Sequence, residues 1–332
     1  MSHSLVSLII CTYNRERFLE KCIDSLVVQT SDIKAIEVIV VDNNSTDGTH
    51  DVVTRYRNRI PAIKYVFEKE QGLSHARNRG CREASGEYLA YLDDDATAPP
   101  QYLENIVDVI THHHPDILGG PIYPYYLDPK PRWFKDEYEI RKHAEKTGFI
   151  DSCRASGGNF IIRRDLLIQL GMFDVNLGMI GETVRLGEER AVIERYRELT
   201  PPGKRKGYYS LECYVNHYVP PSKMKIRNFL KRFYAAGKSS VLVKNKKPKL
   251  AIRKMVELFP HMIGDIRHQI KKSGWKHIDF LYVASRSLIR LGNIVQLFKY
   301  GPVAVFKPHI KRAFGKIKRG IVPTQLNKGK GK

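Results

Sequence analysis

Cysteine is scarce in this sequence, and no two cysteines have a spacing typical of a disulfide framework or a zinc site. The chain contains no Cys-x-x-Cys pair. Its cysteines are scattered among apolar residues at Cys11, Cys22, Cys81, Cys153 and Cys213. Thiols in such surroundings are expected to be buried and to stay reduced, as they do in the cytoplasm.

Long apolar runs are absent as well. No segment reaches the roughly 18–20 apolar residues that a membrane-spanning helix needs. The first residues lack a cationic stretch followed by an apolar core, so they predict no signal peptide. We therefore expect a cytoplasmic protein that lies on the inner face of the membrane, if it contacts a membrane at all.

Acidic side chains are rare in the last third of the chain. Residues 1–200 contain 25 Lys and Arg against 31 Asp and Glu, a net charge of −6, whereas residues 201–332 contain 31 against 4, a net charge of +27. A basic segment of this kind can bind nucleic acid, anionic lipid headgroups or phosphorylated molecules. We expect an α/β domain over 1–238 and a basic, mainly helical extension over 239–332, which either contacts a membrane or packs on the first domain.

Strand and helix patterns alternate over the first 120 residues. Apolar runs predict buried strands at residues 5–11, 37–41, 63–67 and 88–92. Apolar residues at helical spacing predict helices over 17–28, 49–58 and 74–84. This alternation is typical of a mostly parallel sheet with helices on both faces. Further strands are expected over 117–123 and 160–162.

Three polar clusters follow the predicted strands. They are Thr12-Tyr13-Asn14-Arg15, Asp42-Asn43-Asn44 and Asp93-Asp94-Asp95. Ligands of open α/β sheets bind outside the carboxyl ends of the strands, so all three clusters are expected on one rim. Three adjacent carboxylates repel one another, and a divalent cation such as Mg²⁺ or Mn²⁺ would neutralise them. The alternative is an acidic helix start before Pro99, favoured by the helix dipole.

These clusters, together with Gly72-Leu73-Ser74-His75-Ala76-Arg77-Asn78-Arg79-Gly80, resemble the motifs of family 2 glycosyltransferases of the bacterial cell-surface polysaccharide type. The resemblance covers about Leu5 to Gly237. It implies a GT-A fold, a Rossmann-like nucleotide-binding sheet, and inverting transfer of the hexosyltransferase type. The implied donor is a nucleotide-diphosphate sugar, with UDP or GDP expected, and the implied cofactor is Mn²⁺ or Mg²⁺.

The resemblance also implies roles for individual residues. Those matched to nucleotide-sugar binding are Thr12, Tyr13, Asn14, Arg15, Asp42, Asn44, Arg79, Asp93 and Asp94. Asp95 would bind the metal, and His217 either joins it, since imidazole suits Mn²⁺, or is structural. Arg77 either faces the diphosphate or lies on a solvated helix face.

An inverting transfer needs a general base for the acceptor hydroxyl. The family's acidic pair matches Glu188 and Glu189, with Glu189 at the base position, where the family usually has Asp, and Glu188 as the alternative. On the acceptor side, Gly158 and Asn159 match a family strand, and Trp133 either stacks on a sugar or packs internally.

The expected acceptor is a saccharide or a lipid-linked molecule, which suits a basic extension in peripheral contact with a membrane. Nucleic acid is not expected as a partner, because no recognition motif for it is present. The alternative function is an inactive GT-A scaffold that binds membrane or nucleic acid through its basic third. A nucleotidyltransferase would need a Gly-rich phosphate loop with Lys near the first strand, which residues 11–14 lack.

Overall fold

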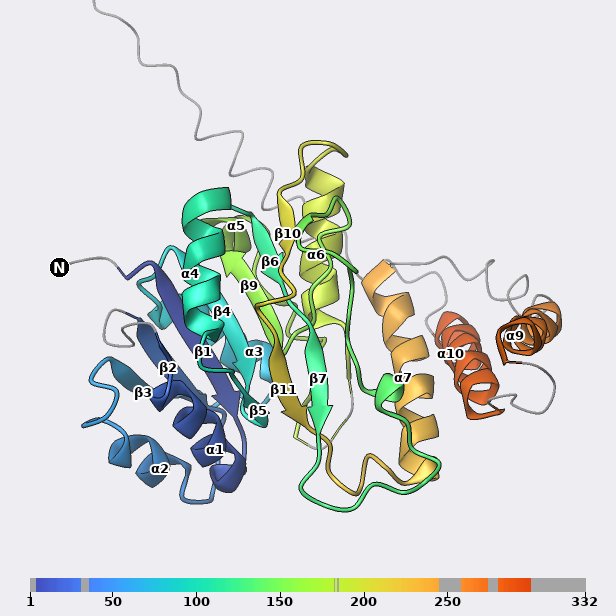
Figure 1. Cartoon of the computed structure of the whole chain (residues 1–332), viewed down its shortest axis with the longest axis horizontal. Helices are drawn as coiled ribbons and strands as arrows, with labels where there is room; N and C mark the ends of the chain where they lie inside the picture. Colours follow the sequence, from blue (N-terminus) through green and yellow to red (C-terminus); the bar gives the residue numbers. More distant parts are fainter. Residues whose placement is uncertain are drawn as a thin grey trace, which may run out of the picture.

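The computed structural model describes residues 4–30, 36–181, 183, 185–244, 258–273 and 280–299. An eight-stranded sheet with the order β3-β2-β1-β4-β9-β6-β10-β8 forms its centre (Figure 1). These strands are β1 (Val6–Thr12), β2 (Glu37–Asp42), β3 (Ile63–Phe67), β4 (Tyr88–Asp93), β6 (Ile117–Gly119), β8 (Gly148–Phe149), β9 (Asn159–Arg163) and β10 (Gly207–Tyr209). A smaller sheet contains β5 (Ala96–Thr97), β11 (Val215–Tyr218) and β7 (Ile122–Tyr125).

Helices cover both faces of the large sheet, as the alternating pattern predicted. One apolar core joins the sheet to α1 (Glu16–Val27), α2 (Thr49–Arg55) and α4 (Tyr102–His113). A second core on the opposite face joins it to α3 (Leu73–Glu83), α5 (Arg164–Gln169) and α6 (Glu188–Leu199). The remaining described helices are the 3₁₀ turn η2 (Asp136–Tyr138), α7 (Ile226–Lys244), α9 (Leu258–Ser273) and α10 (Phe280–Lys299).

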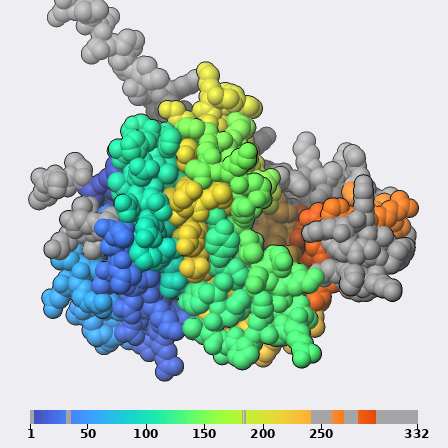
Figure 2. Space-filling view, viewed as in Figure 1, coloured from blue at the N-terminus to red at the C-terminus, as the bar shows by residue number. Residues whose placement is uncertain are grey.

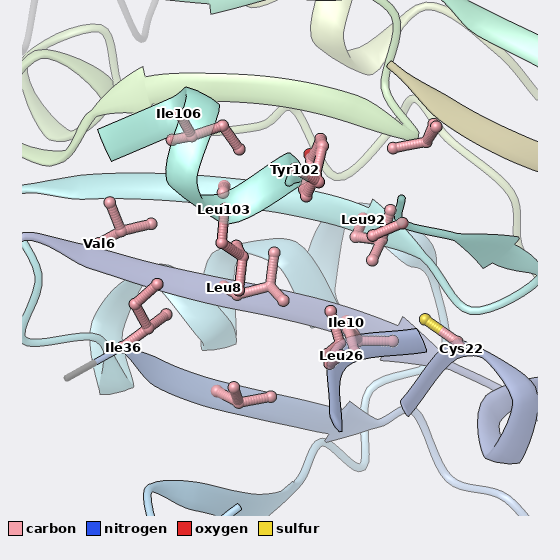
Figure 3. Packing of buried hydrophobic residues seen from close by; sticks show 14 of the residues in the cluster. Val6, Leu8, Ile10, Cys22, Leu26, Ile36, Leu92, Tyr102, Leu103 and Ile106 are labelled. Atoms are coloured by element: carbon pink, nitrogen blue, oxygen red, sulfur yellow. The ribbon is translucent and has the colours of Figure 1, made fainter. Parts of the chain in front are cut away.

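Strand β1 belongs to both cores because successive side chains of a strand point to opposite faces of the sheet. Leu8 and Ile10 pack on the first face with Leu26 and Leu103 (Figure 3), whereas Ile9 belongs to the second core. A strand buried on both faces is mostly apolar, which explains the apolar run at this position. The buried Ser7 within the strand donates a hydrogen bond to Glu37 of β2.

The parallel register brings the predicted polar clusters to one edge of the sheet. β1 pairs in parallel with β2 and with β4, so Thr12 lies opposite Asp42, and Cys11 lies opposite Asp93. The three strands therefore end together, and the loops that follow them share a rim. The prediction of one rim for the three clusters is confirmed.

The prediction of a single strand over 117–123 is wrong. The strand is interrupted at Gly120. The residues before it form β6 of the large sheet, and the residues after it form β7 of the smaller sheet. A Cβ atom at Gly120 would lie 1.8 Å from the carbonyl oxygen of Cys213, so only glycine permits this close crossing. The large sheet is also less parallel than expected, because β9 runs antiparallel between β4 and β6.

The C-terminal helices α7 and α10 pack backbone against backbone. A Cβ atom at Gly237 would lie 2.1 Å from the carbonyl oxygen of Ile289, and one at Gly292 would lie 2.2 Å from that of Tyr234. Helix α7 runs without a break through residue 238, where a domain boundary was expected. In Figure 2 these helices (orange) lie at the end of the molecule opposite the blue N-terminal segments.

None of the helices in the described ranges combines the length and the apolar content that crossing a bilayer requires. The membrane contact was expected of residues 239–332, of which 245–257, 274–279 and 300–332 lie outside the described residues. All five cysteines are unpaired, and all except the half-buried Cys11 are buried, as the sequence predicted.

Candidate active site

A cavity of about 690 Å³ opens at the edge of the sheet where β1, β2 and β4 end. This volume is in the range of small-molecule sites. One wall comes from the loops after these strands, and the start of α6 adds Glu188 and Glu189. The opposite wall comes from residues 122–141, residues 217–223 and the helices α7 and α10.

The acidic cluster after β4 and a histidine of β11 form a candidate metal site. The Nε2 atom of His217 lies 3.1 Å from Oδ1 of Asp95 and 3.5 Å from Oδ2 of Asp93. One ligand atom from each residue lies within 4.8 Å of the other two. Two carboxylates and one imidazole suit Mn²⁺ or Mg²⁺, with waters or phosphate oxygens as further ligands.

The second ring nitrogen of His217 supports this assignment. Nδ1 lies 3.0 Å from the carbonyl oxygen of Tyr218, which fixes the ring with Nε2 toward the carboxylates. Burial lowers the pKa of His217, but the charges of Asp95 and Asp93 outweigh it and raise the pKa overall. A metal ion would have to displace this proton, so we expect its affinity to increase with pH.

Negative charge is crowded at this site. Arg15 donates to Oδ1 of Asp94 at 3.1 Å and to Oδ2 of Asp95 at 2.9 Å. Even so, burial raises the pKa of Asp94 to about 7, and Asp95 and Asp93 add to the rise. A divalent cation would relieve this repulsion, which is the physical reason for three consecutive carboxylates here.

Asp93 is packed closely against the chain between β8 and β9. A Cβ atom at Gly158 would lie 2.3 Å from Oδ2 of Asp93, so glycine is needed for the carboxylate to take its present position. The surrounding protein raises the pKa of Asp93, but a hydrogen bond from His217 and the charge of Arg77 lower it overall. Asp93 is thus held ionised beside the candidate metal site.

Replacing Gly158 with Ala is expected to weaken Mn²⁺ binding about 10-fold, because the new methyl group must displace a candidate metal ligand. Calorimetric titration with Mn²⁺ measures the dissociation constant of the metal in each variant. The control is Gly264→Ala in α9, where an added Cβ meets no atom within 4 Å. Equal Mn²⁺ affinity in the two variants would show that Asp93 is not a ligand of the metal.

The two glutamates at the start of α6 have different surroundings. Glu188 is buried and accepts from Nη1 of Arg77 at 2.7 Å. Arg77 is itself buried, lies over the ring of Phe173, and donates to the carbonyl oxygen of Gly157 at 3.1 Å. Both glutamates line the cavity, but only the carboxylate of Glu188 is held by an ion pair with Arg77.

Glu189 has the properties of a general base. Burial raises its pKa to about 7, the neighbouring Glu188 adds to the rise, and Arg77 opposes it. A carboxylate with a pKa near neutral pH can take a proton from a hydroxyl far better than one of ordinary acidity. Gly187, with φ of 103°, forms the left-handed turn from which α6 starts.

The loops after β1 and β2, residues 12–15 and 42–44, were predicted to bind the nucleotide and are named the nucleotide loops for that reason. Thr12, Tyr13 and Arg15 line the cavity. Asp42 lies behind them, buried, and accepts from the hydroxyl of Tyr65 at 2.7 Å and from the backbone N–H of Ser45 at 2.8 Å.

Asn14 and Asn44, which were predicted to contact the nucleotide, do not line the cavity. Both are exposed turn residues with left-handed backbone angles, φ of 50° and 69°. The side chain of Asn14 accepts from the backbone N–H of Thr46 at 2.7 Å and thereby joins the first two loops. Asn43 lines the cavity instead, and its side chain accepts from the backbone N–H of Gly72 at 2.7 Å.

Three further predicted site residues point elsewhere. Arg79 lies on the outer face of α3 and pairs with Glu83 at 2.8 Å, while Arg77 faces the cavity. Asn159 is fully buried, and its side chain donates to the carbonyl oxygens of Cys213 and Pro121. Trp133 is half-buried, packs edge to face against Phe134 and Phe229, and does not line the cavity.

Sequence reasoning missed most of the wall opposite the nucleotide loops. This wall presents Tyr138, Glu139, Arg141 and Lys223 to the cavity. They come from irregular segments without apolar periodicity, and no motif marked them. An ion pair between Glu139 and Arg232 of α7 ties this wall to the C-terminal helices.

Solved structures define the class of fold. The chain resembles the mannosyltransferase PcManGT from Pyrobaculum calidifontis, in complex with GDP-Man and Mn²⁺, with a TM-score of 0.54 and 20% identity over 96% of this chain and 76% of that one. It also resembles S. aureus TarS in complex with UDP, with a TM-score of 0.51 and 21% identity over 71% and 65% of the two chains. The protein has the GT-A fold of these glycosyltransferases.

Sequence comparison defines the family. Residues 7–171 match the model of "Glycosyl transferase family 2". Through this domain the chain belongs to glycosyl transferase family 2, as its motifs predicted.

Two curated relatives show how far the similarity extends. The glucosyl-dolichyl phosphate glucuronosyltransferase of Haloferax volcanii is 26% identical over 97% of this chain and 98% of its own length. The validoxylamine A glucosyltransferase of Streptomyces hygroscopicus subsp. jinggangensis is 43% identical, but over only 38% of this chain and 30% of its own length. The similarity to the first relative therefore includes the C-terminal helices, whereas the similarity to the second is limited to 38% of this chain.

Proposed function

We propose that this protein is an inverting, metal-dependent glycosyltransferase that moves a hexosyl group from a nucleotide-diphosphate sugar to a hydroxyl group of an acceptor. The observation that carries the proposal is that one cavity contains both the Asp93–Asp95–His217 cluster and the carboxylate of Glu189. Glycosyl transfer needs the group that binds the diphosphate and the base that deprotonates the acceptor to lie in the same cavity, on either side of the sugar.

In the proposed reaction, Glu189 accepts the proton of the acceptor hydroxyl as its oxygen attacks the anomeric carbon of the sugar. The bond from that carbon to the diphosphate oxygen breaks on the opposite side, so the configuration inverts. Asp93, Asp95 and His217 would hold Mn²⁺ or Mg²⁺, whose charge neutralises the departing diphosphate. Arg77 orients this arrangement, since it donates to both Glu188 and Asp93.

A lipid-linked saccharide at the cytoplasmic face of the membrane is the acceptor class that we favour. The net charge of +27 over residues 201–332 suits an anionic membrane surface. Phe233 and Ala236 of α7 and Ile289 of α10 add apolar surface to the cavity. A relative similar over its full length is named for a dolichyl-phosphate-linked sugar, which supports the same class.

A thermal-shift experiment tests the donor site. One of UDP, GDP, CDP and dTDP, at about 100 times its dissociation constant and with Mn²⁺, is expected to raise the melting temperature by about 5 °C, because a ligand of the native state stabilises it by mass action. The same nucleotide with EDTA in place of Mn²⁺ is expected to give a much smaller shift.

The absence of a shift with all four nucleotides would contradict the proposed function. In that case, the inactive scaffold that binds through its basic third becomes the better description.

A further inference from the structure

The cavity wall opposite the nucleotide loops carries more positive than negative charge. Arg141, Lys223 and Arg232 face Glu139, whose two carboxylate oxygens both accept from Arg232, one of them at 3.1 Å. Among the described residues, neither Arg141 nor Lys223 forms an ion pair with a carboxylate. Within the described part of the chain, two cations of this wall therefore have no carboxylate paired with them.

Arg141 is fixed in a position that directs it into the cavity. Its backbone N–H and carbonyl both pair with Ile122 of β7, each at 3.0 Å. Its Nη1 makes only long contacts, 3.3 Å and 3.4 Å, with the carbonyl oxygens of Tyr138 and Glu139. Arg141 lines the cavity and is an exposed residue, so the N–H groups that these carbonyl oxygens do not accept from can bind a ligand.

Arg141 and Glu189 line the same cavity, and the negative charge of Glu189 acts on the Arg141 guanidinium. Burial among protein atoms lowers its pKa, Arg232 lowers it further, and Glu139 and Glu189 oppose the change. The carboxylates whose charge acts on Arg141 are Glu139, which is already paired with Arg232, and Glu189. For Lys223 the carboxylate with the largest effect is Asp95 of the candidate metal cluster.

Two guanidinium groups close together repel each other, and an anion between them turns the repulsion into attraction. A guanidinium binds phosphate or carboxylate with two parallel hydrogen bonds, which makes arginine the residue suited to such a group. The diphosphate of the donor belongs at the metal cluster. A second anion, beside Glu189, would therefore come from the acceptor.

We propose that Arg141, supported by Arg232, is an anion subsite for the acceptor and recognises a phosphate or carboxylate carried close to the hydroxyl that Glu189 deprotonates. The inference rests on the proposed function and narrows its substrate class to anionic acceptors. A phosphate would come from a phosphate-linked saccharide, and a carboxylate would come from an acidic sugar.

The test uses the full chain saturated with Mn²⁺ and the nucleotide diphosphate found by thermal shift, so that the donor's phosphate site is already filled. Glucose 1-phosphate, glucuronic acid and methyl glucoside are then titrated by calorimetry, while a fluorescent nucleotide reports that the diphosphate stays bound. At least one anionic sugar is expected to bind 10-fold or more tightly than methyl glucoside, because a hydrogen bond to a charged group contributes this much or more.

Arg141→Gln is expected to remove this preference and to leave nucleotide binding unchanged. Arg132→Gln, an exposed arginine of the same segment outside the cavity, is the matched control and is expected to keep the preference. Preference for glucose 1-phosphate identifies a phosphate ligand, and preference for glucuronic acid identifies a carboxylate.

Equal binding of the three sugars, or a preference that Arg141→Gln retains, would overturn the inference. Failure of the proposed function is a different result, because it appears earlier as the absence of Mn²⁺-dependent nucleotide binding. Unfolding of the variant is detected by its melting temperature, and Arg141→Lys then provides a second variant that keeps the charge but loses the two parallel hydrogen bonds.

Discussion

Replacement of Glu189 with Gln is expected to lower kcat by about 10²- to 10⁴-fold, the range over which general bases contribute. Glutamine keeps the size of the side chain but cannot accept the acceptor's proton. Nucleotide binding should be unchanged, because Glu189 lies with Glu188 and Arg77 and not in the nucleotide loops. Steady-state transfer assays and nucleotide titration measure the two effects separately.

The pH profile of the unchanged enzyme provides a second measurement on the same residue. Only the ionised carboxylate can act as a base, and the pKa of Glu189 is raised to about 7. We therefore expect kcat/KM to fall about tenfold per pH unit below pH 7 and to level off above it. A glutamate of ordinary acidity would keep full activity down to about pH 5.

The matched control for Glu189→Gln is Glu198→Gln, at an exposed position of the same helix. It should retain activity and the same pH profile. If Glu189→Gln retained most of the activity, the base would have to be sought at Glu188, whose carboxylate is paired with Arg77.

Replacement of Asp95 with Asn is expected to lower transfer activity at least 100-fold and to weaken Mn²⁺ binding, because a charged metal ligand becomes a neutral one. The ligand-free protein should not melt at a lower temperature. Asp95 adds to the repulsion that raises the pKa of Asp94, so its loss relieves crowding, and Arg15 keeps its bond to Asp94.

Asp51→Asn, at an exposed position of α2, is the control for this substitution. Activity assays at several Mn²⁺ concentrations separate weak metal binding, which excess metal restores, from loss of the reaction itself. Full activity of Asp95→Asn at low Mn²⁺ would rule out the metal site at the end of β4.

The sheet was predictable because its central strands are buried on both faces. The apolar runs that became β1, β2 and β4 match the strands to within one residue at each end, since a strand buried on both faces is mostly apolar. The run that became β3 also matches, although Lys64 and Phe67 of this strand are exposed. The order of the strands in the sheet was harder to predict from the sequence. The antiparallel β9 is inserted between β4 and β6 by contacts between residues 41 to 75 positions apart, which a local pattern does not encode.

The candidate site was predictable where its residues follow a strand directly. Thr12, Asp93 and Asp95 are placed by the ends of β1 and β4. The choice between Arg77 and Arg79 failed because the buried face of α3 includes the polar residues Ser74, Arg77 and Asn78, so apolar spacing could not identify that face. The wall containing Glu139 and Arg141 comes from an irregular segment, and only tertiary contacts fix its position.

The tight crossing of α7 and α10 has a consequence for protein engineering. The two helices touch at Gly237 and Gly292, and Ile289, whose backbone meets Gly237, also lines the cavity. A chimera that exchanged the last hundred residues with those of a relative would therefore rebuild one side of the substrate chamber as well as the outer surface. Exchanging the C-terminal third is then expected to change which substrate the cavity accepts. A relative chosen for such a chimera should have the same residues where α7 and α10 touch, Gly237 and Gly292 above all.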